Sequence, residues 1–208
     1  MISHRYKFAF LHLPKCGGSS LMKSFGRCWD DKRYKNGHPN LTTTDTHYSL
    51  HRSNTICVDL DINEYKLFTF VRNPFARIVS AFFYLRDTEL RFRCDRQFRN
   101  EMGLRETDFN QFVKEKLLDT SYMHFDQIID KYIMSCDLDK FDFIGKTENM
   151  QTDCDEICDI INRPKRVLPY TNKSKHKHYT EYYNDETKQI VAEKYAKDIE
   201  YFGYEFGK

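Results

Sequence analysis

Short apolar runs alternate along the chain with segments whose apolar residues recur at helical spacing. Strand-like runs occupy residues 7–13, 55–60, 66–71 and 141–145. Leu21, Phe25 and Trp29 follow the first run at positions i, i+4 and i+8, and this spacing predicts a helix. Strands that alternate with helices are typical of a parallel sheet. The pattern therefore predicts an α/β fold with a mostly parallel central sheet flanked by helices.

The remaining segments predict one terminal helix and two long loops. Helical spacing of apolar residues continues from residues 184–186 to Phe202, and the polar residues at 184–186 can cap this helix. Residues 30–54 and 86–107 lack periodicity, and loops of this length in a compact domain usually serve a function, so we expect ligand recognition there. A chain of 208 residues can bury a substantial core, so a single domain over residues 1–208 is expected.

The first strand-like run leads directly into a glycine pair at the start of a helix. The connecting residues are Pro14, Lys15, Cys16, Gly17, Gly18, Ser19 and Ser20. Two glycines let the backbone approach a ligand closely, and a lysine adds positive charge. This segment predicts a site for phosphate or sulfate. An ordinary strand-to-helix connection is the alternative, and the Walker order does not fit because Lys15 precedes both glycines.

A second strand-like run ends at Arg72, before a helical segment that begins with Pro74. Proline suits the first helical turn, where its missing N–H costs nothing. Arg72 at the strand end and Ser80 in the helix could reach one anion from two sides. The alternative is that Arg72 pairs with a carboxylate and that Ser80 packs against a neighbouring helix.

Together these two segments resemble the sulfotransferases that use 3′-phosphoadenosine 5′-phosphosulfate (PAPS). Residues 14–20 look like the 5′-phosphosulfate loop of that family, and residues 71–80 look like its 3′-phosphate motif. The resemblance implies a P-loop-like nucleotide-binding core and PAPS as the sulfuryl donor. It implies cofactor-binding roles for ten residues: Lys15, Cys16, Gly17, Gly18, Ser19, Ser20, Arg72, Ser80, Lys173 and Ser174. Lys173 and Ser174 belong to a segment that resembles the loop closing over the nucleotide.

The resemblance to this family continues downstream, and one departure indicates the branch. Residues 141–150 look like the third core strand of the family and its turn, and residues 195–204 resemble the terminal helix of the carbohydrate branch. Enzymes that act on small phenols and steroids usually carry Thr-Thr-Trp after the loop glycine, whereas Ser19 and Ser20 stand here. The resemblance therefore implies a heparan or chondroitin type of enzyme, with a glycan acceptor.

In-line sulfuryl transfer needs a base and a group that stabilises the leaving phosphate. Lys15 is expected to stabilise the charge on the leaving group. His47 resembles the histidine that serves as base in heparan sulfate 2-O-sulfotransferase and related enzymes, and His51 is the alternative base. A histidine with a purely structural hydrogen bond is the other interpretation of either residue.

Composition narrows the range of partners. The net charge of +2 does not indicate nucleic acid, and no apolar run is long enough for a membrane span. Seven cysteines without a secretory leader indicate a reducing, cytoplasmic location, unless the chain is a trimmed piece. The spacing of Cys154 and Cys158 is a poor zinc pattern, so no metal is expected.

The sequence thus predicts a PAPS-dependent sulfotransferase that acts on a hydroxyl group. Two alternatives come from other functional classes. One is a nucleotide-dependent kinase with an atypical loop, which the absence of a lysine after the glycines disfavours. The other is a noncatalytic nucleotide-binding protein with the same fold.

Overall fold

The computed structural model describes residues 2–3, 6–25, 65–133, 141–169 and 176–208. By its internal packing the chain divides into two compact units. The first unit comprises Met1–Arg72 and Ile128–Asn172, and the second comprises Asn73–Gln127 and Lys173–Lys208. The single domain expected over residues 1–208 stays a prediction, and each unit is described by itself below.

The first unit contains a sheet in the strand order β1-β2-β3-β4. The strands are β1 (Ile2–Ser3), β2 (Phe8–Leu11), β3 (Lys66–Val71) and β4 (Phe143–Lys146). Strands β2, β3 and β4 run parallel, and the short β1 pairs antiparallel with β2. The predicted α/β fold with a mostly parallel sheet is confirmed. Of the predicted strands, residues 55–60 lie outside the described residues.

Aromatic side chains fill the core on the strands of this sheet. All four residues of β2 are buried, as expected for a strand that is covered on both faces. The ring of Phe68 on β3 lies 5.1 Å from Phe8 and 5.4 Å from Phe10, between ring centres. These contacts join the two strands that precede the predicted anion-binding segments.

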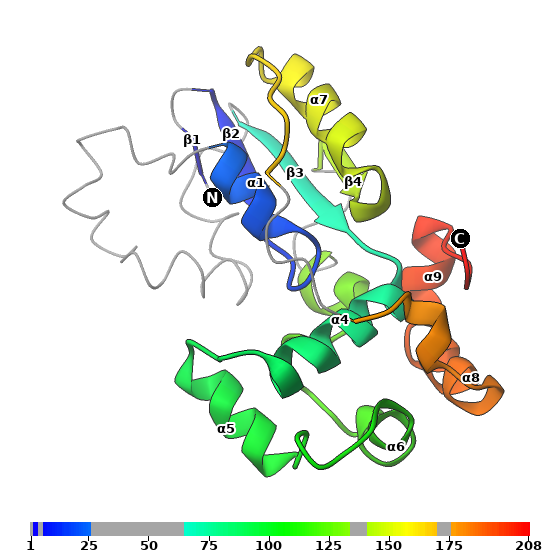
Figure 1. Cartoon of the computed structure of the whole chain (residues 1–208). Helices are drawn as coiled ribbons and strands as arrows, with labels where there is room; N and C mark the ends of the chain where they lie inside the picture. The colour runs from blue at the N-terminus through cyan, green and yellow to red at the C-terminus, as the bar shows by residue number, and fades with distance from the viewer. Residues whose placement is uncertain (1, 4–5, 26–64, 134–140, 170–175) are drawn as a thin grey trace. The chain divides into compact units, whose positions relative to one another are not determined.

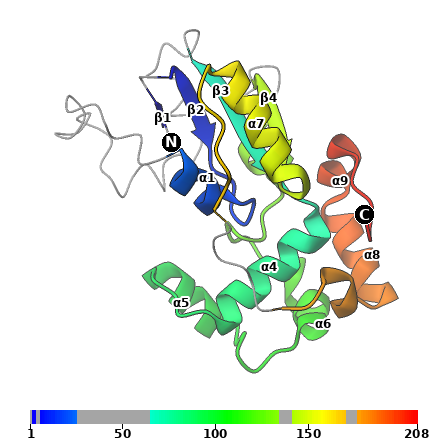
Figure 2. The ribbon, with the colours of Figure 1, turned by 45° about the horizontal axis from the view of Figure 1, so that its top comes forward.

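Two helices of the first unit pack next to the sheet. Helix α1 (Gly18–Ser24) follows β2, and Phe25 at its C-terminal end contacts Phe8 and Phe68. Helix α7 (Met150–Ile160) lies along β4 (Figures 1 and 2). A single 3-10 turn, η7 (Thr147–Asn149), connects β4 to α7. This unit also contains a π-helical turn, η4 (Ile129–Ile133), which precedes β4 in the chain. The helices therefore follow the strands in the order that the hydrophobic pattern predicts.

The second unit is built around helix α4 (Pro74–Asp87). Asn73 caps this helix, because its side-chain oxygen accepts a hydrogen bond from the Phe75 N–H over 3.1 Å. Every residue of α4 from Pro74 to Phe82 is buried. Apolar side chains from the rest of the unit surround it, among them Phe112, Phe125, Val191 and Tyr195.

The prediction of a loop over residues 86–107 is wrong in its middle part. Residues Arg93–Glu101 form helix α5. Its sequence shows little apolar periodicity, because polar side chains, Asp95 and Arg99, occupy buried positions that apolar residues usually fill. The helix is held by hydrogen bonds to these groups and by stacking of Phe98 on Tyr122, so hydrophobic spacing could not reveal it.

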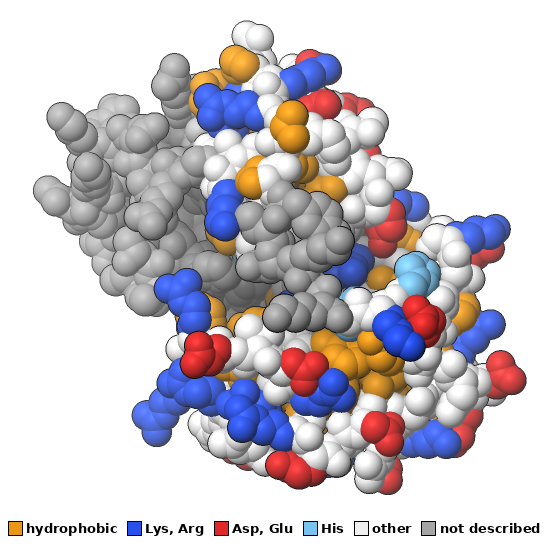
Figure 3. Space-filling model, in the orientation of Figure 1, with side chains coloured by type: hydrophobic (Ala, Val, Ile, Leu, Met, Phe, Trp, Pro, Cys, Tyr) orange, Lys and Arg blue, Asp and Glu red, His pale blue; other side chains and the backbone are white. Residues whose placement is uncertain are grey.

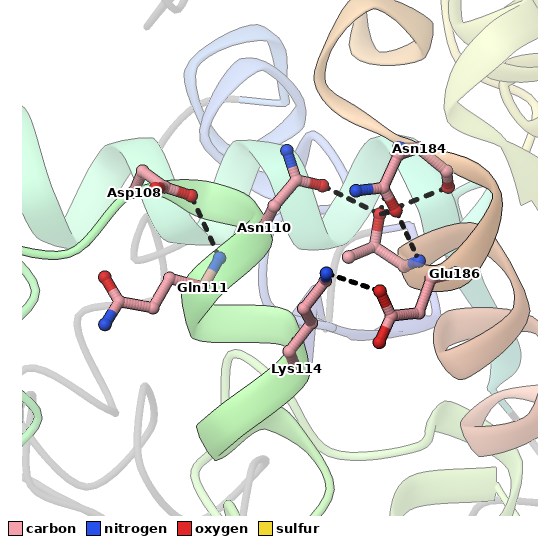
Figure 4. Close-up of polar contacts among 7 residues, drawn as sticks. Asp108, Asn110, Gln111, Lys114, Asn184 and Glu186 are labelled. Atoms are coloured by element: carbon pink, nitrogen blue, oxygen red, sulfur yellow. Dashed lines mark hydrogen bonds and ion pairs between the residues drawn. The ribbon is translucent and has the colours of Figure 1, made fainter.

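Helix α6 (Phe109–Phe112) continues into a π-helical turn, η3 (Val113–Leu117), and both lie against helix α8 (Asp185–Lys194). Figure 4 shows the polar contacts at this junction. Asn184 and Thr187 form a reciprocal capping box, and the Thr187 hydroxyl also bonds the side chain of Asn110 over 2.8 Å. An ion pair between Lys114 and Glu186 lies beside it. The cap predicted at residues 184–186 is confirmed.

The predicted terminal helix is divided at Tyr195. Helix α8 ends at Lys194, and helix α9 spans Ala196–Phe202. The Tyr195 side chain is fully buried and its hydroxyl donates to the Phe125 carbonyl. A 3-10 turn, η8 (Tyr179–Tyr182), precedes α8 and contacts α4. None of the helices in the described part of the chain has the length and hydropathy that a transmembrane helix needs.

Candidate functional site

Three parallel strands of the first unit end at one edge of the sheet. The strand register places Leu11 of β2 beside Thr69, and Val71 of β3 beside Lys146 of β4. Residues 14–20, Arg72 and Thr147 follow these strand ends directly. Ligands of parallel α/β sheets bind at the carboxyl ends of the strands. The structure thus brings Arg72 and the predicted anion-binding loop to the edge where such a site is expected.

We call residues 14–20 the glycine loop. Its backbone enters the left-handed region twice, at Lys15 with φ 65° and at Gly17 with φ 76°. A lysine in this region is strained by roughly 1–2 kcal/mol, whereas glycine adopts it freely. Strained residues of this kind are typical of binding loops. The unusual backbone at Lys15 is therefore a second sign, besides its charge, that this turn serves a ligand.

Both glycines of the loop are required by their neighbours. A Cβ atom on Gly17 would lie 2.4 Å from the Met150 Cε atom, and one on Gly18 would lie 2.2 Å from the His12 Nε2 atom. Real side chains do not approach so closely, so a larger residue at either position must displace its neighbour. At Gly18 the obstacle is the His12 ring, whereas at Gly17 the positive φ itself favours glycine and Met150 contributes only the flexible end of its side chain.

Arg72 is tied to the glycine loop by a direct hydrogen bond. One of its terminal nitrogens, Nη1, donates to the Lys15 carbonyl over 3.3 Å. The Thr147 hydroxyl donates to the carbonyl of Val71, the residue before Arg72, over 2.8 Å. These two hydrogen bonds hold the guanidinium group and the Lys15 backbone together. Two cationic residues on neighbouring strand ends suit a doubly phosphorylated ligand.

The remaining residues of the loop shape its turn. Cys16 is buried, and its thiol donates to the Pro14 carbonyl over 3.5 Å. Ser20 is buried and Ser19 is half-buried, and the Ser20 N–H donates to the Gly17 carbonyl over 3.0 Å. The structure places Lys15, Cys16 and Gly17 in a turn, and Gly18, Ser19 and Ser20 in the first turn of helix α1 that follows it. Their contacts with a nucleotide stay a prediction.

Ser80 belongs to the second unit, on helix α4, where it is 4% exposed. One turn earlier on the same face lies Arg77, which is fully buried. The Arg77 guanidinium donates to the backbone carbonyls of His124 and Asp126 and lies over the Tyr195 ring. Arg77 therefore joins α4 to residues 124–126. The binding of one phosphate by Arg72 and Ser80 stays a prediction.

A second concentration of polar groups surrounds Asp95 on α5. We call Tyr84, Asp95, Tyr122 and His124 the Asp95 cluster. Asp95 is 2% exposed, and its Oδ2 atom accepts a hydrogen bond from the Tyr84 hydroxyl over 2.9 Å. Its Oδ1 atom accepts from the Tyr122 hydroxyl and lies 3.4 Å from the His124 Nε2 atom. Three donors therefore converge on one buried carboxylate.

The surroundings of Asp95 shift the pKa values of the cluster. Burial alone would raise the pKa of Asp95, but hydrogen bonds from His124 and Tyr122 outweigh it and hold that pKa below its ordinary value. Burial, together with the charge of Asp95, raises the pKa values of Tyr84 and Tyr122 well above the ordinary value. The aspartate is therefore charged and both tyrosines are neutral near neutral pH.

Basic side chains gather on the surface over α5, in the lower left of Figure 3. Arg91, Arg93 and Arg96 are exposed there, and Arg96 Nη1 donates to the Leu90 carbonyl over 2.7 Å. Arg86 instead pairs with Asp87 over 2.6 Å. This surface matches the run of basic residues in the sequence.

Several predicted site residues lie outside the described residues: His47, His51, Lys173 and Ser174. Their roles stay predictions. Within the described ranges, no group of three or more His, Cys, Asp or Glu residues is arranged to hold a metal ion. Cys154 and Cys158 are both buried thiols, and burial raises the pKa of Cys154 to about 12.

Sequence reasoning missed the residues that support the glycine loop from outside it. His12 covers Gly18, and Thr147 and Met150 cover Gly17. The signal for Thr147 and Met150 was their place in residues 141–150, a segment with a family resemblance but no assigned role. No sequence signal distinguishes His12, because its contact with Gly18 arises only from the fold of the turn between them, or Asp95 within its run of arginines, because its partners belong to other segments.

The whole arrangement can be compared with known proteins. No curated protein sequence matches the chain. A family model does match, with the description Sulfotransferase family, and it covers residues 1–205. The match includes the glycine loop, Arg72 and both units. A parallel sheet with a cationic glycine loop at its carboxyl edge agrees with that match, and the chain belongs to the sulfotransferase family, the enzymes that transfer sulfuryl groups.

Proposed function

We propose that this protein transfers a sulfuryl group from PAPS to a hydroxyl group of a carbohydrate acceptor. The observation that carries the proposal is the hydrogen bond from Arg72 to the Lys15 carbonyl. It joins the segment that resembles the 5′-phosphosulfate loop to the segment that resembles the 3′-phosphate motif. PAPS carries a phosphate on the 3′-oxygen and a phosphosulfate on the 5′-oxygen of one ribose. Its binding therefore requires such a pair of neighbouring anion sites.

The residues at the sheet edge fit this donor. Gly17 and Gly18 carry no side chain, so none stands between the loop backbone and a phosphate group. Lys15 and Arg72 supply two positive charges next to that backbone. PAPS, when bound, supplies the activated sulfuryl group. Lys15 then stabilises the negative charge that grows on the oxygen bridging sulfur and the 5′-phosphate.

The acceptor side of the reaction needs a base. We assign this role to the imidazole of His47, with His51 as the alternative. As the acceptor oxygen bonds to sulfur, the imidazole takes its proton, and the bond between sulfur and the bridging oxygen breaks. Adenosine 3′,5′-bisphosphate leaves. No redox change is involved, and Lys15 and Arg72 need no metal ion to bind the anion.

Further residues complete the nucleotide site in this proposal. Ser80 hydrogen-bonds the 3′-phosphate together with Arg72, and Lys173 and Ser174 close over the nucleotide. The carbohydrate acceptor is supported by Ser19 and Ser20, which stand where enzymes of small phenols carry Thr and Trp, and by the resemblance of residues 195–204 to the terminal helix of the carbohydrate branch.

The donor is tested by calorimetry with adenosine 3′,5′-bisphosphate in the presence of a metal chelator. We expect binding to the wild-type protein and about ten- to hundredfold weaker binding to Arg72→Ala, since a hydrogen bond to a charged group is worth about 1.5–3 kcal/mol. Lys66→Ala is the matched control, because Lys66 is an exposed cation at the opposite end of β3, the strand that Arg72 follows. Binding that requires Mg²⁺ and ATP would instead support the kinase alternative.

Transfer itself is tested with labelled PAPS and a panel of glycans, lipids and phenols. We expect label on a glycan, and loss of turnover by roughly 10²–10⁴ in His47→Ala with unchanged nucleotide affinity. If His51→Ala loses turnover and His47→Ala does not, the base is His51. A protein that binds the bisphosphate but labels no acceptor would support the noncatalytic alternative.

A further inference from the structure

The last residues of the chain contact the start of helix α4, the helix that carries Ser80. We call residues 205–208 the tail. The Asn73 side-chain nitrogen donates to two carbonyls of the tail, to Glu205 over 2.8 Å and to Lys208 over 3.2 Å. Asn73 is only 1% exposed. Asn73, the tail and α4 all belong to the second unit, so these contacts lie within one compact body.

One side chain thus performs two tasks at the start of α4. The oxygen of the Asn73 amide accepts from the Phe75 N–H and caps the helix, while its nitrogen holds the tail. An amide carries its acceptor oxygen and its two N–H donors on separate atoms, so one side chain can cap the helix and donate to two other groups. Serine or aspartate could cap the helix as well, but neither would donate to the two tail carbonyls from the same position.

An aromatic cage fastens the tail at a second point. The Phe206 ring stands edge-on to Phe75, Tyr179 and Tyr183, with ring centres 5.1, 5.6 and 5.4 Å away. Phe75 lies in the first turn of α4, and its carbonyl accepts a hydrogen bond from the Tyr183 hydroxyl over 2.9 Å. The cage therefore acts on the same helical turn as Asn73.

Tyr179 completes the attachment. Its hydroxyl accepts a hydrogen bond from the Gly207 N–H over 2.7 Å and lies 3.5 Å from the Lys208 carbonyl, to which it donates. Hydrogen bonds, ring packing and the Asn73 amide thus converge on a tail of four residues. Most tail residues are exposed, so burial of apolar surface alone does not account for this density of specific contacts.

We propose that Asn73 and the tail are positioning groups for nucleotide binding: they fix the first turn of α4, and through this helix they orient Ser80 toward the 3′-phosphate. The inference rests on the proposed function, because it assigns the 3′-phosphate to Ser80. Ser80 lies about two turns beyond Asn73, and a helix transmits an orientation over that length with little bending. The tail then contributes to affinity without touching the ligand.

The test compares two ligands and two independent variants. Asn73→Ser keeps the helix cap but loses the donor to the tail, and Phe206→Ala empties the aromatic cage. We expect each variant to bind adenosine 3′,5′-bisphosphate about two- to tenfold more weakly than wild type. Each should impair the hydrogen bond from Ser80 to the 3′-phosphate, and a hydrogen bond is worth about 0.5–1.5 kcal/mol. Binding of adenosine 5′-phosphosulfate, which lacks the 3′-phosphate, should not change.

A double-mutant cycle separates positioning from a general loss of stability. If the tail acts through Ser80, Phe206→Ala should cause no further loss of affinity when Ser80 is already alanine. Full additivity of Phe206→Ala and Ser80→Ala would overturn the inference, as would equal losses for both ligands. Tyr201→Ala is the control, since Tyr201 is an aromatic residue on α9 that is 54% exposed. We expect it to bind both ligands like wild type.

Two further measurements keep the outcomes distinct. Thermal melting shows whether each variant is folded, and Phe206→Leu, which keeps an apolar side chain in the cage, should recover part of the affinity if Phe206→Ala is unstable. If Ser80→Ala binds the bisphosphate as tightly as wild type, the assignment of Ser80 in the proposed function is wrong. If Ser80→Ala weakens binding and both tail variants do not, only the present inference is wrong.

Discussion

The glycine loop of the first unit and the Asp95 cluster of the second unit both concentrate polar groups, but they are built in opposite ways. In the loop, the backbone is shaped by close neighbours, and Lys15, a half-buried cation, stands in a strained conformation. In the cluster, a buried carboxylate is enclosed by three side-chain donors of its own unit.

The difference separates a site for a ligand from a structural polar network. A buried carboxylate whose oxygens are satisfied stabilises the fold and has little capacity left for a ligand. A strained cationic loop at the edge of a parallel sheet costs folding free energy, and a bound anion can offset that cost. Changes in the loop should therefore affect activity most, and changes in the cluster should affect stability most.

The largest expected effect is on turnover, from Lys15→Ala. Removal of one preorganised electrostatic group typically lowers turnover by roughly 10²–10³, because the lost interaction exists mainly in the transition state. Lys23→Ala is the matched control, since Lys23 is an exposed lysine on helix α1. Sulfuryl transfer from labelled PAPS measures both variants. A variant at Lys15 that turns over at nearly the wild-type rate would remove this residue from the mechanism.

A change in the Asp95 cluster should lower the stability of the fold rather than turnover. Asp95→Asn removes the charge that three donors share, and we expect the free energy of unfolding to fall by about 1.5–3 kcal/mol at neutral pH. Denaturant unfolding measures this loss. Asp108→Asn is the control, because Asp108 caps helix α6 at an exposed position and asparagine caps equally well. Equal stability of the two variants would contradict the structural role of the cluster.

The same cluster predicts the pH dependence of stability. Because the pKa of Asp95 is held below its ordinary value of 3.8, its contribution is complete above that pH and is lost as the pH falls through the lowered pKa. The raised pKa values of Tyr84 and Tyr122 affect stability at alkaline pH. Their contribution is complete below the ordinary value of 10.0 and is lost as the pH rises through the raised values. Asp95→Asn should abolish the acidic part of this profile.

A smaller effect is expected from Gly18→Ala, and it tests whether the loop is shaped by its neighbours. The new methyl group would overlap the His12 ring, and overpacking of this kind costs about 1–3 kcal/mol. Thermal unfolding and nucleotide affinity should both fall. Addition of His12→Ala should restore part of the thermal stability and part of the nucleotide affinity, because the obstructing ring is gone. A double variant no better than Gly18→Ala would show that His12 is not the constraint.

Sequence patterns predicted the sheet and the loop more accurately than they predicted the helices of the second unit. Strands β2 and β3 are almost entirely buried and lie within the apolar runs that predicted them, since a strand covered on both faces is largely apolar. The half-buried strand β4 overlaps its predicted run. Helix α5 was taken for a loop, because Asp95 and Arg99 occupy its buried face. The break at Tyr195 was missed for a related reason: apolar spacing continues across it.

The chain by itself determined the local features of this protein. The apolar runs, the glycine pair after Lys15 and the arginine at a strand end are all encoded within a few neighbouring residues, and they sufficed to place the chain with the sulfotransferases. Tertiary structure alone decided which residues support them. Examples are the contacts of His12 with Gly18, of Thr147 with Val71 and of Asn73 with the tail. The last of these joins positions that lie 135 residues apart. Such contacts leave no periodic trace in a sequence, because they arise only when the packed elements bring distant side chains together.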